Sequence, residues 1–339
     1  MDKLIIQNQI SKLPISSYNK IRLYNYISRI YWKFSCSPGE YDRRINKNSF
    51  VPSGLYYGQE QWMKEYCSFN DIVYAYIEHG VYFGDNRSKV GWSPEWDLGN
   101  IITFGDSRYN LLKDIYPDYN IVRVGPRIHY APTDLAYKEY IKSKLLPDSK
   151  TMTLYPAHAI HDDSHSFNTK GFIDEALEVA NSLNIKNILV SLHPIDLAHG
   201  VELQYQGMNM IVVSGGSSNE GFLPRLKAIM ELSDLTYSNA LGTHVGYSIY
   251  MGTPHILSTS SNPPRSKGEF SSNVTNRIYQ ERTLFENVFS GKDGMSITKE
   301  QIDLCDYYWG FSHVKSSELL YRELSNCKNH FFQHFKKIK

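Results

Sequence analysis

Hydroxyl groups, an amide and a glycine are concentrated between residues 238 and 243 of the chain. Ser238 and Asn239 follow a short β-prone run, and Gly242 and Thr243 precede a stretch with helical spacing. Thr243 can act as the N-cap of that helix. Such a turn presents free backbone N–H groups and the positive end of a helix dipole, which both attract phosphate. We therefore expect these four residues to hold a phosphate group, although a plain strand-to-helix connection has the same pattern.

Three other segments could contribute to the same phosphate site. His193 and Pro194 end a buried apolar run, and an imidazole can donate a hydrogen bond to a phosphate or ribose oxygen. Gly216 lies in a Gly-Gly-Ser-Ser turn whose backbone amides can cradle a phosphate; a flexible turn is the alternative. Arg225, just inside the next helix, is a suitable cation for the same group.

A loop rich in His and Asp lies at residues 156–165. Its spacing matches no zinc motif, and its His and Asp do not share one helix face, so we expect no bound metal. We expect His158 and His161 to contact the phosphate or the sugar of a ligand instead.

Glu78 and His79 form a second reactive group, directly after an apolar run over residues 71–77. A carboxylate at a strand end can act as general base for an incoming hydroxyl, and His79 can orient or share that proton. A strand-end turn with an exposed Glu and a capping His is the alternative. The loop that follows is rich in aromatic residues, which stack on sugar faces, so it is a candidate acceptor site. Its candidate residues are Tyr82, Asp85, Trp92 and Trp96.

Two parallel sheets would bring these residues together. Alternating strand and helix patterns predict an α/β fold whose ligands lie outside the carboxyl ends of the strands. Expected helices cover residues 134–145, 169–184 and 222–232, and Gly252 with Pro254 ends the helix after the 238–243 turn. The expected strands are residues 71–77, 100–104, 121–124, 150–155, 187–192, 210–214, 235–238 and 255–257.

We expect two Rossmann-like domains that face a cleft. The amino-terminal, acceptor-binding domain would cover residues 1–147, and the nucleotide-binding domain would cover residues 148–312. Residues 313–339 would form a final helix and a basic tail. That tail combines Lys with Phe, which suits an anionic membrane surface, although a solvated tail has the same composition.

Composition narrows the class of protein. A chain of 339 residues with 41% hydrophobic residues is long enough for two cores, and a net charge of +1 gives no strong field for nucleic acid. The four cysteines are widely scattered and indicate a reducing compartment rather than a disulfide framework. With neither a signal peptide nor an apolar run long enough to span a bilayer, we expect a cytoplasmic protein, peripheral on the inner face of the cytoplasmic membrane if its tail binds there.

The stretch from residue 233 to residue 256 resembles the carboxyl-terminal domain of GT-B glycosyltransferases. That family has an Asp before a strand, a Ser at the strand end, a small-residue turn and a Gly-x-Pro-x-Ile motif. The matching residues here are Ser233-Asp234, Ser238-Asn239, Gly242-Thr243 and Gly252-Thr253-Pro254-His255-Ile256. The resemblance covers mainly residues 150–260 and implies that the second domain binds a nucleotide-sugar donor. It also implies that a final helix, over residues 313–327, crosses back to the first domain.

His193-Pro194 together with the 238–243 turn resembles the His-Pro and Ser-Ser/Thr motifs of bacterial GT-B sialyltransferases and their Kdo-transferring relatives. In those families both motifs hold cytidine monophosphate, and an acidic Asp/Glu-Asp/Glu-Gly motif supplies the base. Glu78-His79-Gly80 matches in part, because His replaces the second acidic residue, and Ser238-Asn239 lacks the strict pair. The resemblance implies a CMP-sugar donor such as sialic acid or Kdo, and the departures leave UDP- and GDP-sugars open.

These patterns lead to one hypothesis with two alternatives. We expect a metal-independent GT-B glycosyltransferase, with Glu78 as general base and without a cofactor. It would extend a bacterial surface glycan such as a capsule or lipopolysaccharide, in solution or on a lipid carrier. An NDP-sugar 2-epimerase of the same architecture is one alternative, and a non-catalytic glycan-binding subunit is the other.

Overall fold

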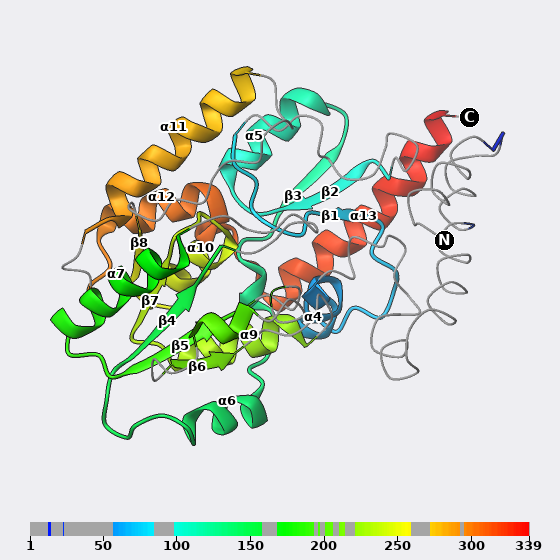
Figure 1. Cartoon of the computed structure of the whole chain (residues 1–339). Helices are drawn as coiled ribbons and strands as arrows, with labels where there is room; N and C mark the ends of the chain where they lie inside the picture. The colour runs from blue at the N-terminus through cyan, green and yellow to red at the C-terminus, as the bar shows by residue number, and fades with distance from the viewer. Residues whose placement is uncertain are drawn as a thin grey trace.

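The structure is a computed structural model that describes residues 13–14, 23, 57–84, 98–157, 168–192, 196, 201–205, 210–213, 221–258, 272–291 and 295–338. Within these residues the chain forms two parallel sheets flanked by helices, one of three strands and one of five (Figure 1). The expected α/β class with two parallel sheets is therefore confirmed. No helix among the described residues is both long enough and apolar enough to cross a membrane.

The first sheet has the strand order β1-β2-β3. The strand expected over residues 71–77 is shorter than predicted, because only Tyr76 and Ile77 pair with the neighbouring strand. Helix α5 (Asp106–Ile115) connects the second and third strands of this sheet. The strands are β1 (Tyr76–Ile77), β2 (Asn100–Thr103) and β3 (Asn120–Arg123).

The second sheet has the order β6-β5-β4-β7-β8, so its first strand lies in the middle and the order reverses there. In open parallel sheets, ligands bind at the carboxyl ends of the strands beside this reversal. The strands are β4 (Thr151–Tyr155), β5 (Asn187–Ser191), β6 (Met210–Val213), β7 (Leu235–Ser238) and β8 (His255–Leu257). The elements between them are α7 (Thr169–Ser182), η5 (Val201–Tyr205), α9 (Phe222–Glu231) and α10 (Thr243–Tyr250).

The chain crosses between the two sheets twice. It passes to the second sheet through η4 (Arg127–His129) and α6 (Leu135–Lys142), and Asp134 caps α6 by accepting from the Tyr137 N–H. It returns through α12 (Lys299–Trp309) and η6 (Phe311–His313), after α11 (Ser272–Phe289) has covered part of the second sheet. The final helix is α13 (Ser317–Ile338).

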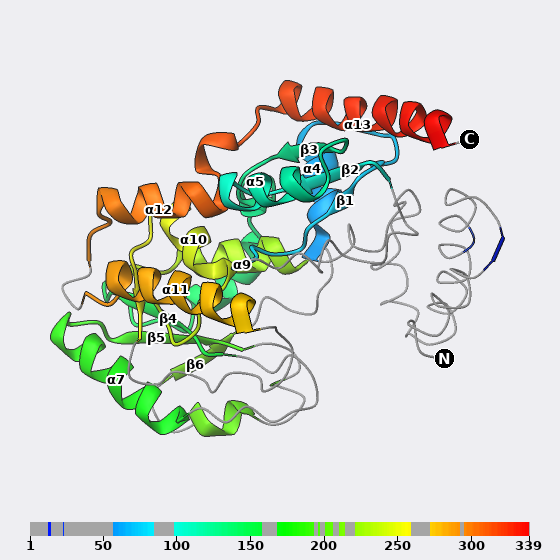
Figure 2. The ribbon, with the colours of Figure 1, turned by 90° about the horizontal axis from the view of Figure 1, so that it is seen from above.

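Helix α13 completes the core of the first sheet. Figure 2 shows it running along that sheet, next to α4 (Gln59–Tyr66). Its Leu320 and Leu324 are fully buried in one cluster with Val73, Ile77 and Ile102. The carboxyl-terminal part of the chain therefore belongs structurally to the amino-terminal sheet.

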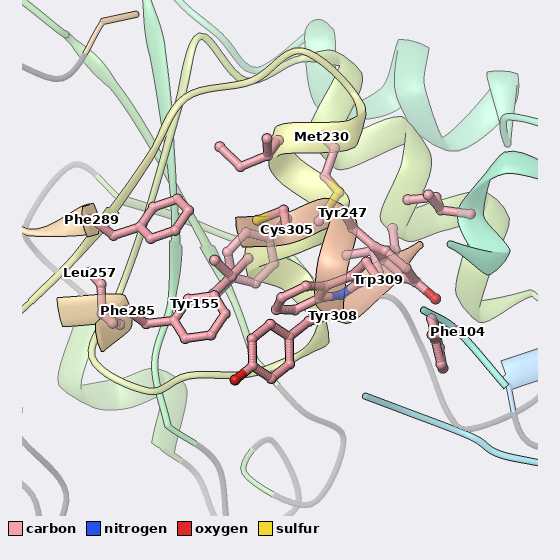
Figure 3. Packing of buried hydrophobic residues seen from close by; sticks show 14 of the residues in the cluster. Phe104, Tyr155, Met230, Tyr247, Leu257, Phe285, Phe289, Cys305, Tyr308 and Trp309 are labelled. Atoms are coloured by element: carbon pink, nitrogen blue, oxygen red, sulfur yellow. The ribbon is translucent and has the colours of Figure 1, made fainter. Parts of the chain in front are cut away.

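The largest buried cluster among the described residues joins the two halves of the molecule. It contains Phe104 from the end of β2, Tyr155 from the end of β4, Phe285 from α11 and Trp309 from α12 (Figure 3). The backbone approach is also close, since a Cβ atom added at Gly310 would lie 2.5 Å from the carbonyl oxygen of Phe104. The carboxyl ends of the two sheets are thus packed against a shared apolar centre.

Candidate functional site

The turn after β7 leads directly into α10. The N-cap of this helix is Gly242, which has an extended backbone (φ −154°, ψ 178°), so the expectation that Thr243 is the N-cap is wrong. Thr243 is the first helical residue, and its hydroxyl accepts a hydrogen bond from the backbone N–H of Val81 at 3.3 Å. Its carbonyl accepts from the indole N–H of Trp309 at 3.0 Å. The start of α10 is thus held by the Val81 N–H, from the loop after β1, and by the Trp309 N–H, from α12.

Ser238 shapes this turn from within. Its side chain is fully buried, and its Oγ lies 3.0 Å from the carbonyl oxygen of Ala240 and 3.0 Å from Nε2 of His255. The other ring nitrogen of His255 lies 2.8 Å from the hydroxyl of Thr236. Burial, with a smaller effect from the neighbouring His244, holds the pKa of His255 well below its usual range, so the ring is neutral. The Ser238 side chain therefore points into the protein, and the hydrogen bonds of its hydroxyl stabilise the turn.

Asn239 joins the ends of the two strands beside the reversal in strand order. It is fully buried, and its Oδ1 accepts from the backbone N–H of Ala157, two residues beyond β4, at 2.8 Å. Its own carbonyl oxygen lies 3.5 Å from Nη2 of Arg282 on α11. The amide thus aligns the β4 and β7 ends where a ligand of this sheet would bind.

Tyr155 lies at the carboxyl end of β4, beside the start of α10. Its ring stacks on the imidazole of His244, with centroids 4.9 Å apart and planes 17° apart. The side chain is 6% exposed, and burial raises the pKa of this phenol far above its usual range. Within the described part of the chain its hydroxyl has no hydrogen-bond partner. A buried polar group of this kind is unfavourable until a ligand or water satisfies it.

The carboxylate of Glu78 at the end of β1 is fully buried in an ion pair. Its Oε1 lies 2.8 Å from both Nε and Nη2 of Arg108, which is in the first turn of α5 and 4% exposed. Its Oε2 accepts from the hydroxyl of Thr103 at 2.7 Å. Both oxygens are therefore engaged, which favours a role in fixing the following loop over direct contact with a substrate.

His79, by contrast, is exposed at the same strand end. Its Nδ1 lies 3.2 Å from the hydroxyl of Tyr82, and Arg108 lies over the Tyr82 ring at 4.7 Å. Burial raises the pKa of Tyr82 above its usual range, and the nearby Glu78 raises it further, so the phenol remains protonated. The loop that begins at His79 therefore presents an imidazole bonded to a neutral phenol.

Aromatic rings link this loop to the start of α9. Tyr57 lies between the two, with its ring centroid 6.3 Å from that of His79 and 4.5 Å from that of Phe222. Tyr57 thus borders the exposed imidazole and also contacts Phe222 at the start of α9. Flat apolar surfaces of this kind suit the face of a sugar or a base.

Not all of the other predicted site residues lie near the start of α10 and the loop after β1. Arg225 forms an ion pair with Asp134 at 3.5 Å and lies 5.2 Å from the Tyr137 ring, and both contacts are on the α6 side of α9. Eight other predicted site residues lie outside the described residues, and their roles stay predictions. They are Asp85, Trp92, Trp96, His158, His161, His193, Pro194 and Gly216.

Sequence reasoning missed several residues that the structure brings to the site. Arg108 and Thr103 neutralise and orient Glu78, and Glu281 of α11 accepts from the backbone N–H of Gly84. The one available signal was for Arg108, a cation in the first turn after a neighbouring strand end. Within the part of the chain that is described, no three His, Cys, Asp or Glu side chains are grouped so as to hold a metal ion.

No protein-family model and no curated sequence matches this chain. Solved structures resemble its fold at low identity. The wall teichoic acid polymerase TagF is 12% identical, over 74% of this chain and 66% of that one, with a TM-score of 0.41. UDP-GlcNAc 2-epimerase from Neisseria meningitidis is 13% identical, over 81% of this chain and 73% of that one, with a TM-score of 0.39. The corresponding epimerase from Methanocaldococcus jannaschii is 13% identical, over 78% of this chain and 73% of that one, with a TM-score of 0.41.

Proposed function

We propose that the chain is a glycosyltransferase that moves a sugar from a nucleotide-sugar to an acceptor hydroxyl. One observation supports this most directly. The loop after β1 and the turn after β7 are in contact, through the 3.3 Å hydrogen bond from Val81 to Thr243. Both follow the carboxyl ends of parallel strands, so groups that could activate an acceptor lie next to groups that could hold a phosphate.

In this proposal the donor phosphate binds at the start of α10. The backbone N–H groups there and the helix dipole stabilise the departing phosphate without a metal ion. The buried hydroxyl of Tyr155, beside His244, is a further donor for the same ligand. A CMP-sugar is favoured by the sequence resemblance, in which His193-Pro194 would hold the nucleotide, and UDP- and GDP-sugars are the alternatives.

His79 is the better candidate for the general base. Its imidazole is exposed at the strand end, whereas the carboxylate of Glu78 is buried and paired with Arg108. Imidazole titrates near neutral pH, which suits proton removal from an incoming hydroxyl. Glu78 then acts as a positioning residue, because its ion pair fixes the start of the loop that carries His79.

The acceptor in this proposal is a growing bacterial surface glycan, such as a capsule or lipopolysaccharide. Tyr82 and the aromatic loop after it, with Asp85, Trp92 and Trp96, would line its site. We further propose that the enzyme acts in the cytoplasm, at the inner face of the membrane where its basic tail can bind anionic lipid.

The proposal is tested by donor binding and by transfer. Thermal unfolding is followed with CMP, UDP and GDP, because a ligand at a hundred times its Kd stabilises by about 2.7 kcal/mol. Transfer from the matching labelled nucleotide-sugar is then measured for the wild type and for His79→Asn. We expect one nucleotide to stabilise the protein, and His79→Asn to slow transfer by about 100-fold or more. Nucleotide binding without any transfer or sugar release would count against the catalytic role.

A non-catalytic glycan-binding subunit remains the second candidate, and the burial of Glu78 favours it. It predicts glycan binding without donor turnover in both the wild type and His79→Asn. A 2-epimerase would instead convert the nucleotide-sugar to its 2-epimer, or release the free epimerised sugar and the nucleotide by hydrolysis, without an added acceptor. Product analysis with and without acceptor therefore separates the three functions.

A further inference from the structure

Helix α11 contacts both halves of the proposed site through two adjacent residues. Glu281 accepts a hydrogen bond from the backbone N–H of Gly84, in the loop after β1. Arg282 places Nη2 3.5 Å from the carbonyl oxygen of Asn239, in the turn after β7. These two partners lie in different domains, and the residues that meet them are neighbours in one helix.

The apolar contacts of α11 likewise reach both the loop after β1 and the histidine that supports the turn after β7. Phe285 is fully buried, and its ring lies 5.6 Å from that of Phe83 in the first loop. Phe289, one helical turn further on, lies 6.1 Å from the ring of His255, which braces the second turn. Figure 3 shows Phe285 and Phe289 within the central cluster beside Tyr155. Each polar contact is thus supported by a packed ring of the same helix.

A helix is rigid over such a distance, so the two contacts fix the spacing between the loop and the turn. We propose that α11 is the positioning element of the site: Glu281 sets the acceptor loop and Arg282 sets the donor turn. This inference depends on the proposed function, since it assigns donor and acceptor to these two segments. Arg282 takes the place beside the donor turn that the sequence assigned to Arg225.

Glu286 offers a matched control for Arg282. Its Oε1 lies 2.7 Å from Nε of Arg282, one turn along the helix. Glu286→Gln weakens this ion pair but leaves the guanidinium near Asn239. Arg282→Met removes the cation and retains much of the apolar stem, and Arg282→Lys retains the charge. Asn287→Ala, at an exposed position of α11, controls for changes in the helix itself.

The experiment measures nucleotide Kd by calorimetry and acceptor KM by transfer for each variant. Arg282→Met should weaken nucleotide binding by about tenfold and change acceptor KM less than twofold, with Arg282→Lys in between. Glu281→Ala should raise acceptor KM by about tenfold and leave nucleotide Kd within twofold. Glu281→Gln keeps an accepting oxygen, so its acceptor KM should be close to that of the wild type. Glu286→Gln and Asn287→Ala should resemble the wild type.

Backbone amide exchange gives a second measurement that does not depend on turnover. Glu281→Ala should speed exchange in residues 81–84, and Arg282→Met should speed it in residues 239–243. If the wild type binds nucleotide and both variants match it in Kd, KM and exchange, the inference is wrong and the proposed function stands. Equal losses in Glu286→Gln and Arg282→Met would also overturn it. If the wild type binds no nucleotide, the proposed function itself fails, and the inference fails with it.

Discussion

The backbone N–H of Val81 donates to the hydroxyl of Thr243 over 3.3 Å and so joins two segments that are 162 residues apart in the chain. Gly80 allows this approach, because a Cβ atom added there would lie 3.2 Å from the same hydroxyl. The contact places the loop that carries the exposed imidazole of His79 next to the start of α10. It is therefore the structural basis of the site proposed here.

Thr243→Val tests that contact with little change in side-chain volume. The variant cannot accept from Val81, so we expect a loss of about 1 kcal/mol in the free energy of unfolding and weaker nucleotide binding. Thr243→Ser keeps the hydroxyl and should retain most of the stability and most of the nucleotide affinity. Urea unfolding and nucleotide titration measure the two effects. If Thr243→Val matched the wild type in its free energy of unfolding and in its nucleotide affinity, the contact would be unimportant.

Glu78→Gln separates a structural role from a purely catalytic one. Removal of one charge from a buried ion pair typically costs about 3–5 kcal/mol, so we expect a loss of this size in the free energy of unfolding. In the double variant Glu78→Gln/Arg108→Met the loss should be smaller than the sum of the two single losses. Urea unfolding of all four proteins measures this coupling. A Glu78→Gln protein of wild-type stability that has lost transfer would instead support Glu78 as the base.

The second sheet could be predicted closely from the sequence, because its signals are local. The apolar run over residues 235–238 matches β7 to the residue, and Gly252 has the positive φ of 80° expected after a helix end. The signals for β1 were misleading for a physical reason. Val73 and Ala75 are buried in one cluster with Leu320 and Leu324 of α13, from the far end of the chain, so their apolar pattern resembles that of a strand although they precede β1.

The site itself was less predictable, because its decisive pairs are distant in sequence. The sequence predicts Glu78 as a general base at a strand end, and it gives no sign that Arg108, 30 residues later, forms an ion pair with the same carboxylate. Ser238 looked like a ligand contact until His255 was found to engage its hydroxyl inside the protein. A residue type and its place at a strand end identify a reactive group, but only the packed structure shows which side of the strand end it faces.

Gly246→Ala tests how tightly α10 is fixed. A Cβ atom added at Gly246 would lie 2.1 Å from Cδ2 of Trp309, whose ring is fully buried and whose N–H holds the start of α10. Overpacking of this kind typically costs about 1–3 kcal/mol, and we expect a loss at the upper end, with reduced nucleotide affinity. Gly291→Ala, where an added Cβ atom meets nothing within 4 Å, is the control. Equal urea midpoints for the two variants would contradict this packing.

The pH dependence of stability should report the buried His255. Burial lowers its pKa in the folded protein, while the unfolded chain takes up the proton near the ordinary value of about 6.5. The unfolded state therefore binds more protons below that pH, and stability must fall as the pH is lowered. The slope from this one group is about 1.4 kcal/mol per pH unit between the unfolded and folded pKa values.

His255→Gln removes that titration and keeps groups that can hydrogen-bond to Thr236 and Ser238. We expect the variant to be less stable than the wild type at pH 8, because the amide fits these partners less well, and the difference to narrow steadily below pH 6.5. Urea unfolding of the wild type and of His255→Gln at several pH values measures this difference. A constant difference between His255→Gln and the wild type across this range would mean that His255 takes up its proton at the same pH in the folded and the unfolded protein, since a group with the same pKa in both states adds no slope.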